Sequence, residues 1–148
     1  MIKAVHLIAG LLATLTIAAF FLSTVIAELF GTQGAMATVM RLIANPGLLI
    51  LVPTIAVTGS SGFSLSKSRP GRLAQAKQKR MILIAANGLL ILIPSALFLD
   101  RWASVGVLDR TFYWVQGVGL LAGAVNLTLM GMNIRDGLKM SGRFRVHS

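Results

Sequence analysis

The chain has no cysteine and very few acidic residues or histidines. Its 148 residues include 0 Cys, 4 Asp and Glu together, and 2 His. The absence of cysteine excludes disulfides, thiolate metal sites and covalent c-type haem attachment, while either redox compartment stays compatible with it. The carboxylates lack the fixed spacing of an acid–base pair, and the sequence contains no metal-ligand cluster or phosphate-binding glycine loop. The sequence therefore assigns no catalytic residue and no metal ion.

A long polar segment is also missing. Hydrophobic residues make up 55% of the chain, and its mean hydropathy is +0.80. A soluble globule of this size has too little polar surface to cover so much apolar material. The longest polar stretch, residues 60–80, is too short for a separate soluble domain. We therefore expect one domain, residues 1–148, embedded in a lipid bilayer.

Four apolar segments separated by short polar ones fill most of the chain. A helix needs roughly 20 residues to cross about 30 Å of hydrocarbon, and the first segment is longer than the ~7–15-residue core of a secretory signal, so we expect it to be retained as a span. Short connections favour antiparallel neighbours. The predicted fold is an all-α, integral membrane four-helix bundle. Its predicted spans are residues 4–29, 42–59, 82–99 and 112–132.

Prolines indicate where the second and third helices begin or bend. The Asn45-Pro46 pair lies near the predicted start of the second span, and Pro53 lies near its middle. Pro53 removes a backbone hydrogen bond and should kink the helix, and a neighbouring helix or Thr54 can bond the freed carbonyl. Pro70 is expected near the start of the third helix, since proline is favoured there.

The positive charges are distributed unevenly along the chain. There are 14 Lys and Arg against 4 Asp and Glu, and threading four spans places 11 of these cations on one side. The positive-inside rule then puts both termini in the cytoplasm of a bacterial inner membrane. Anionic headgroups are expected partners of the basic side, at ~1 kcal/mol per residue. No aromatic residue interleaves the cations of residues 67–80, so nucleic acid is not expected as a partner.

Small and amide residues recur on one face of the fourth span. Small residues let another helix approach closely, and amides form hydrogen bonds worth ~0.6–2 kcal/mol across such an interface. We expect this face to pack inside the bundle, or against a second copy or another membrane protein; ligand lining by Asn126 or Asn133 is the alternative. The face comprises Gln116, Gly119, Gly123, Asn126, Met130 and Asn133, at offsets of three and four.

The first span carries ionisable residues at both ends of one face. His6 and Gly10 lie near the cytoplasmic end, and Glu28 lies near the outer end. Arg41 is the cation nearest to Glu28 across a short loop, so an interfacial ion pair is expected. A carboxylate that handles protons or faces a partner is the alternative, since ionisable groups within spans are costly and often functional.

His6 is the only histidine near a span. One interpretation is an axial ligand of haem b, with Gly10 leaving room for the porphyrin and a methionine or second nitrogen completing the coordination. The other is a hydrogen-bonded interfacial histidine, with Asp136 as its partner. Two histidines on facing helices would be the stronger haem pattern, and the second histidine here is His147, in the tail.

The opening segment, residues 2–9 (IKAVHLIA), resembles the start of small helical membrane proteins related to HemJ-type protoporphyrinogen oxidase and the copper-resistance D membrane domain. In the HemJ-type family a histidine on the first helix and a lysine near the third are implicated in haem binding. The resemblance implies these roles for His6 and Lys79. After the first span the sequence departs from that family, because residues 28–31 read ELFG in place of an aromatic and basic segment.

Three functions are compatible with these features. The leading hypothesis is a non-catalytic subunit or scaffold of a membrane complex that packs through the face on the fourth span. The alternative is a haem-binding redox protein that uses His6 for electron transfer or porphyrinogen oxidation. A small transporter is the third, although four spans without an inverted repeat would need dimerisation to supply the missing half.

The predicted orientation is testable with reporter fusions. We expect a fusion within residues 67–80 to report a cytoplasmic location, because that loop carries six of the cations. A fusion within residues 104–109 should report the opposite side and serves as the control. A periplasmic signal from the first fusion would reverse the predicted topology.

Overall fold

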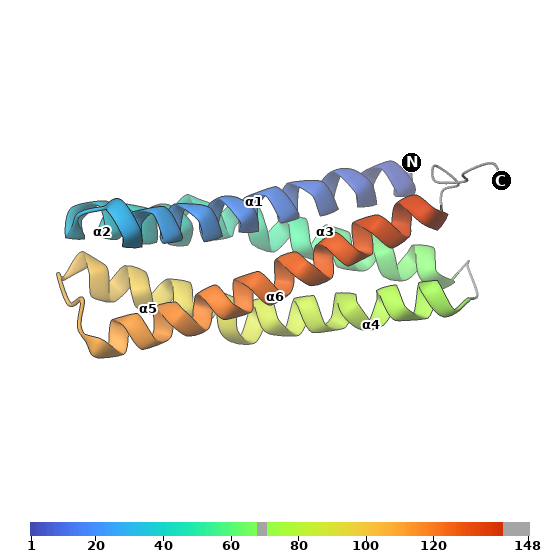
Figure 1. Ribbon diagram of the computed structural model, residues 1–148. Coiled ribbons are helices and arrows are strands. Elements are labelled where there is room, and N and C mark those ends of the chain that lie inside the picture. Colours follow the sequence, from blue (N-terminus) through green and yellow to red (C-terminus); the bar gives the residue numbers. More distant parts are fainter. Residues whose placement is uncertain (68–70, 141–148) are drawn as a thin grey trace.

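The computed structural model describes residues 1–67 and 71–140, and these fold into four long helical rods, each antiparallel to the next along the chain (Figure 1). The N-terminus, the end of α3, the start of α4 and the end of α6 lie at one end of the bundle. The turn from α1 to α2 and the loop from α5 to α6 lie at the other. The predicted all-α class is confirmed, and no strand occurs in the described residues.

The first rod is a single helix that ends in a short capped turn. Helix α1 spans Ile2–Phe30, and Gly31 then adopts an extended conformation with φ −88° and ψ 169°. Thr32 caps the next helix, α2 (Gln33–Leu42), by accepting a hydrogen bond of 3.2 Å from the backbone N–H of Ala35. The second rod therefore begins at Gln33, nine residues before the predicted second span, residues 42–59.

The second rod contains a kink at Asn45-Pro46, near the predicted start of the second span. It continues from α2 through a π-helical turn, Ile43–Gly47, into α3, Leu48–Lys67. Asn45 leaves the helical region, at φ −150° and ψ 115°, because the following proline excludes the helical conformation. A Cβ at Gly47 would clash with the Phe20 ring, so the absence of a side chain lets α1 pack closely against the kink.

Helix α3 continues through Pro53. The Thr54 hydroxyl donates hydrogen bonds to the carbonyls of Ile50, at 3.0 Å, and Leu51, at 2.8 Å. The carbonyl that Pro53 deprives of its partner is that of Leu49, four residues earlier. Thr54 therefore bonds neighbouring carbonyls and not the one for which it was expected.

The third rod also contains a π-helical turn, and the fourth rod is one helix. The third comprises α4 (Arg72–Asn87), a π-helical turn (Gly88–Leu92) and α5 (Ile93–Ser104), and the fourth is α6 (Arg110–Met140). The π-helical turn precedes Pro94, which lacks an N–H and clashes with the preceding turn of a regular helix. The expected start near Pro70 lies outside the described residues.

All four rods are long and apolar enough to cross a membrane, which suggests a multi-pass membrane protein. Large hydrophobic side chains cover their outer faces; Leu15 is 66% exposed and Leu121 71% exposed. Such apolar faces are suited to contact with lipid tails, because the hydrocarbon region of a bilayer contains no water. The candidate spans are Ile2–Phe30, Gln33–Leu65, Arg72–Ser104 and Arg110–Lys139.

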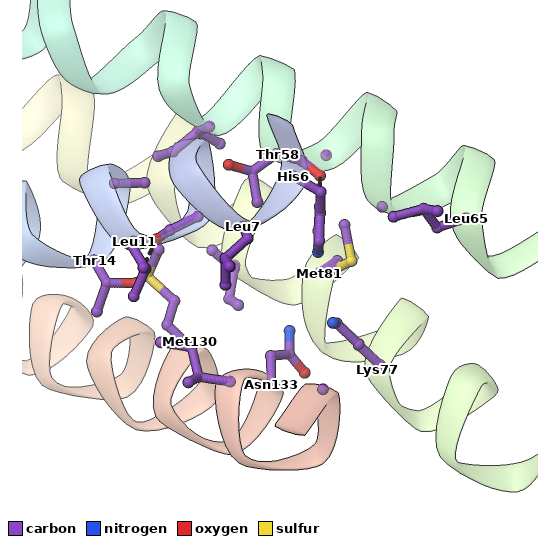
Figure 2. A pocket seen from close by; sticks show the side chains of 18 of the residues that line it. His6, Leu7, Leu11, Thr14, Thr58, Leu65, Lys77, Met81, Met130 and Asn133 are labelled. Atoms are coloured by element: carbon purple, nitrogen blue, oxygen red, sulfur yellow. Dashed lines mark hydrogen bonds between the residues drawn. The ribbon is translucent and has the colours of Figure 1, made fainter. Parts of the chain in front are cut away.

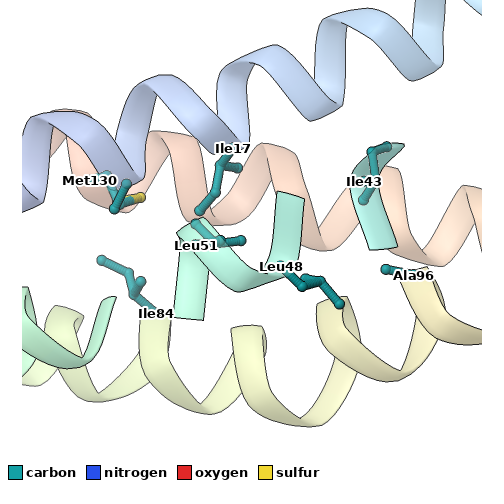
Figure 3. Close-up of a cluster of buried hydrophobic side chains, with 8 residues drawn as sticks. Ile17, Ile43, Leu48, Leu51, Ile84, Ala96 and Met130 are labelled. Atoms are coloured by element: carbon teal, nitrogen blue, oxygen red, sulfur yellow. The ribbon is translucent and has the colours of Figure 1, made fainter. Parts of the chain in front are cut away.

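In the half of the bundle that holds the N-terminus, α1 and α4 occupy diagonal positions. Helix α1 packs along α3 and α6, and α4 packs along the same two helices. Each of the four contributes to a buried apolar cluster at mid-bundle that includes Ile17, Leu51, Ile84 and Met130 (Figure 3). The cavity described below lies between this cluster and the end of the bundle that holds the N-terminus.

A pair of amides, Asn87 half-buried and Asn126 buried, joins α4 to α6 beside this cluster. Asn126 is fully buried. Asn87 Nδ2 donates to Asn126 Oδ1 and to the Ala122 carbonyl, each at 2.8 Å. Asn126 Nδ2 in turn donates to the Ile84 carbonyl at 3.3 Å. The amides therefore satisfy each other and two backbone groups in an apolar interior.

Replacement of Asn126 should destabilise the bundle. Asn126→Ala removes both interhelical bonds of Asn126, and we expect a loss of about 1–2 kcal/mol in the free energy of unfolding measured in mixed micelles. Thr128→Ala is the matched control, because the exposed Thr128 hydroxyl bonds only to Ala124 of its own helix. Equal stability of the two variants would contradict the role of the amide pair.

Candidate functional site

A cavity of about 580 Å³ lies between the four rods at the end that holds the N-terminus (Figure 2). Side chains from α1, α3, α4 and α6 line it, and most of them are apolar. Its volume falls within the ~300–1,000 Å³ that small-molecule and cofactor sites occupy. The site therefore has the size and wall chemistry of a ligand pocket.

Glycines explain why this half of the bundle is hollow. Gly10, Gly59, Gly62 and Gly137 all line the cavity, and none has a side chain to fill it. A Cβ at Gly10 would lie 3.5 Å from Thr58 Cγ2, so α1 approaches α3 closely at this level. That approach positions the residue one turn earlier on α1, which is His6.

The His6 ring is held by two acceptors on α3. Its Nδ1 lies 3.1 Å from the Thr58 carbonyl oxygen and 3.1 Å from Ser61 Oγ. A carbonyl only accepts, and the Ser61 hydroxyl donates its own proton to the Val57 carbonyl at 2.5 Å. His6 Nδ1 therefore donates. In the neutral ring, Nε2 then carries the lone pair, and the ring extends into the cavity (Figure 2).

Met81 approaches the same point from α4. A Cβ at Gly62 would lie 2.8 Å from His6 Cε1 and 2.9 Å from Met81 Sδ. The imidazole and the thioether therefore pack over one bare stretch of α3 backbone, and they reach it from diagonal helices. The contact of both side chains with one glycine of α3 is a feature of the tertiary structure.

The cations at the cavity are Lys3 and Lys77. Lys79, to which the resemblance assigned a role, is exposed and does not line the cavity. Two residues along a helix rotate a side chain by about 200°, so Lys77 and Lys79 point in nearly opposite directions. Lys77 therefore lines the cavity, and Lys79 lies outside it. The signal was present in the sequence, since Lys77, Met81 and Ile84 follow offsets of four and three.

Asp136 pairs with Arg80 and not with His6, the partner considered in the sequence analysis. Arg80 Nη1 donates to Asp136 Oδ2 at 2.6 Å, and Arg135 Nε lies 3.4 Å from Asp136 Oδ1. Arg80 Nη1 also lies 3.5 Å from Asn133 Oδ1. His6 is hydrogen-bonded, but to α3 and not to Asp136. The Arg80–Asp136 pair joins α4 to α6 beside the cavity, and its nearly buried carboxylate is compensated by two guanidinium groups.

Glu28 at the other end of the bundle is bonded to an amide. Gln116 Nε2 donates to Glu28 Oε2 at 2.9 Å, and Gln116 Oε1 is buried without a hydrogen-bond partner. The expected pair of Glu28 with Arg41 does not form. Within residues 1–67 and 71–140, the ion pairs that the structure shows both involve Asp136. Arg41 is exposed on α2.

The small and amide residues of α6 face the interior. Gln116, Asn126 and Asn133 are buried. A Cβ at Gly119 would lie 3.6 Å from Ser95 Cβ, and one at Gly123 would lie 3.5 Å from Phe21 Cδ2. This face therefore packs within the chain itself. Asn133 also lines the cavity, as the alternative interpretation proposed for it, whereas Asn126 does not.

Comparison with known proteins adds no assignment. No family model, no curated protein and no solved structure matches the chain. Residues 1–67 and 71–140 contain no group of three or more His, Asp and Glu side chains placed to hold a metal ion. The second histidine, His147, lies outside the described residues. Any function must therefore be argued from the geometry around His6.

The tautomer of His6 can be measured directly. Nitrogen-15 NMR of histidine-labelled protein above pH 8 should show a protonated Nδ1 and an unprotonated Nε2, in a signal identified by its loss in His6→Ala. Ser61→Ala should keep this tautomer, because the Thr58 carbonyl remains as an acceptor. A proton on Nε2 in the parent protein would contradict the described hydrogen bonds.

Proposed function

We propose that the protein is a multi-pass protein of the bacterial inner membrane that binds haem b in the cavity, with His6 as an axial ligand. One observation carries the proposal: His6 Nδ1 donates to the Thr58 carbonyl, which leaves the Nε2 lone pair directed into the cavity. An imidazole whose other nitrogen donates to a backbone carbonyl is the usual arrangement of a histidine that ligates a metal.

The remaining lining fits an amphipathic macrocycle. The apolar walls suit a porphyrin ring, and the ammonium groups of Lys3 and Lys77 provide positive charge for its carboxylates. Bound haem supplies one-electron chemistry. The residues of this chain would hold it, orient it and keep water from it.

The neighbouring residues keep the site in shape. Thr58 and Ser61 fix both the orientation and the tautomer of His6. The ion pair of Arg80 with Asp136 holds α4 against α6, so the two walls beyond His6 keep their spacing. The apolar cluster that contains Ile17 lies at the mid-bundle end of the cavity, and two of its members, Ile84 and Met130, line the cavity.

The alternative role, a non-catalytic subunit or scaffold, has less support. It was expected to dock a partner through the small and amide residues of α6, and these side chains pack inside the bundle. The outer apolar faces are suited to lipid without a partner. A scaffold also provides no reason for a hollow interior with a preset histidine.

Haem binding is tested by the absorption spectrum of protein expressed with a full supply of haem. We expect a Soret band in the parent protein. In His6→Ala the band should be lost, or the affinity for haem should fall by at least about tenfold, because one metal–ligand bond contributes more than the ~1.4 kcal/mol of a tenfold change. His147→Ala is the matched control and should leave the band unchanged.

Two outcomes would oppose the proposal. A parent protein without a Soret band would favour the scaffold, especially if mild detergent released it in a complex with other membrane proteins. A band that survives in His6→Ala would show that haem binds elsewhere, and the assignment of this ligand would fail.

A further inference from the structure

A second cavity, of about 80 Å³, lies in the half of the bundle away from the N-terminus, and it shares no lining residue with the cavity at His6. Both π-helical turns border it. Ile43 begins the first turn, Leu48 follows that turn, Leu92 ends the second turn, and all three line the cavity. Ile43 and Leu48 also belong to the apolar cluster with Ile17 (Figure 3). Such turns occur frequently at functional sites.

Two hydroxyl groups line this second cavity from different helices. Thr24, on α1, and Ser95, on α5, are only 6% and 8% exposed. The hydroxyls of Thr14 and Thr58 each donate to a carbonyl of their own helix, at 2.7 Å and 2.6 Å. Within residues 1–67 and 71–140, the structure shows no hydrogen bond from the side chain of Thr24 or of Ser95. A hydroxyl without a partner is costly in an apolar interior, so these two require one.

A third group without a partner lies one turn farther along α6. Gln116 is 3% exposed, and its Nε2 donates to Glu28, whereas its Oε1 is buried without a hydrogen bond. Gly119, three residues along the same face, lines the second cavity, and a Cβ there would lie 4.0 Å from Ser95 Oγ. Glu28 is exposed and stands one turn beyond Thr24 on α1. Polar groups therefore continue from the cavity toward this end of the bundle.

We infer that the second cavity binds small neutral molecules that carry a hydroxyl group, with Thr24 and Ser95 as the binding side chains. A hydroxyl both donates and accepts, so it pairs with another hydroxyl in either sense. The described residues that line the cavity carry no charge that would compensate an ion. The volume is below the ~150 Å³ of a cavity that holds benzene, and it suffices for two or three water molecules at ~30 Å³ each. Water and a short-chain alcohol share this chemistry and this size.

The experiment uses the full chain in lipid nanodiscs and does not depend on haem. Proton NMR measures magnetisation transfer to the methyl groups of Leu99, which lines the cavity, from water and, in a second sample, from the methyl protons of dilute ethanol. We expect transfer in the parent protein and a several-fold smaller transfer in the double variant Thr24→Val with Ser95→Ala. The matched control is Thr16→Val with Ser23→Ala, because those hydroxyls donate to their own helix, and it should keep the transfer.

The two samples separate the two ligands. Transfer from water alone identifies a hydrated site, and transfer from ethanol that weakens the water signal shows that alcohols bind as well. Absence of both transfers in the parent, or equal transfer in the double variant, would overturn the inference.

The stability of Thr24→Val gives a second readout. If the hydroxyl is bonded to a bound molecule, its removal should raise the equilibrium constant of unfolding about two- to tenfold. If the hydroxyl has no partner, its replacement by an apolar group of the same shape should stabilise the protein. A Thr24→Val protein that is more stable than the parent would therefore contradict the inference.

Discussion

The hydrogen bond from His6 Nδ1 to the Thr58 carbonyl is the interaction on which the site depends. It requires α1 to lie close to α3, and the two helices are in van der Waals range at Gly10, where a Cβ would lie 3.5 Å from Thr58 Cγ2. In an apolar interior a lone imidazole N–H would be costly, so the bond selects both the position and the tautomer of the ring. The other ring nitrogen, Nε2, then points toward the cavity.

In the half of the bundle that holds the N-terminus, other polar side chains of α4 and α6 hold these two helices together. Asn87 and Asn126 satisfy each other and the α4 and α6 backbones, and Arg80 pairs with Asp136. Each of these contacts ties α4 to α6, whereas His6 ties α1 to α3. The cavity lies between the two pairs of helices. Nε2 of His6 and the thioether of Met81 remain among the groups that line it.

The apolar segments and the depth of His6 follow from local features, and so they were predictable. The start of the second rod was not predictable in this way, because Asn45-Pro46 satisfies the local rules for a helix start. In the structure the chain is already helical from Gln33, and packing of α1 against the bare Gly47 accommodates the kink inside the rod. Likewise, Lys79 was chosen over Lys77 from a resemblance, although helical rotation places Lys77 on the cavity side.

The amino-acid sequence by itself determined that the chain is helical and apolar and that small and amide residues share one face of α6, since composition and periodicity are properties of neighbours along the chain. Tertiary structure alone decided that this face packs inward, that Glu28 bonds to Gln116 and not to Arg41, and that His6 and Met81 meet over Gly62. The physical reason is that each of these facts depends on which helices are adjacent and on their rotation, and residues far apart in sequence set both.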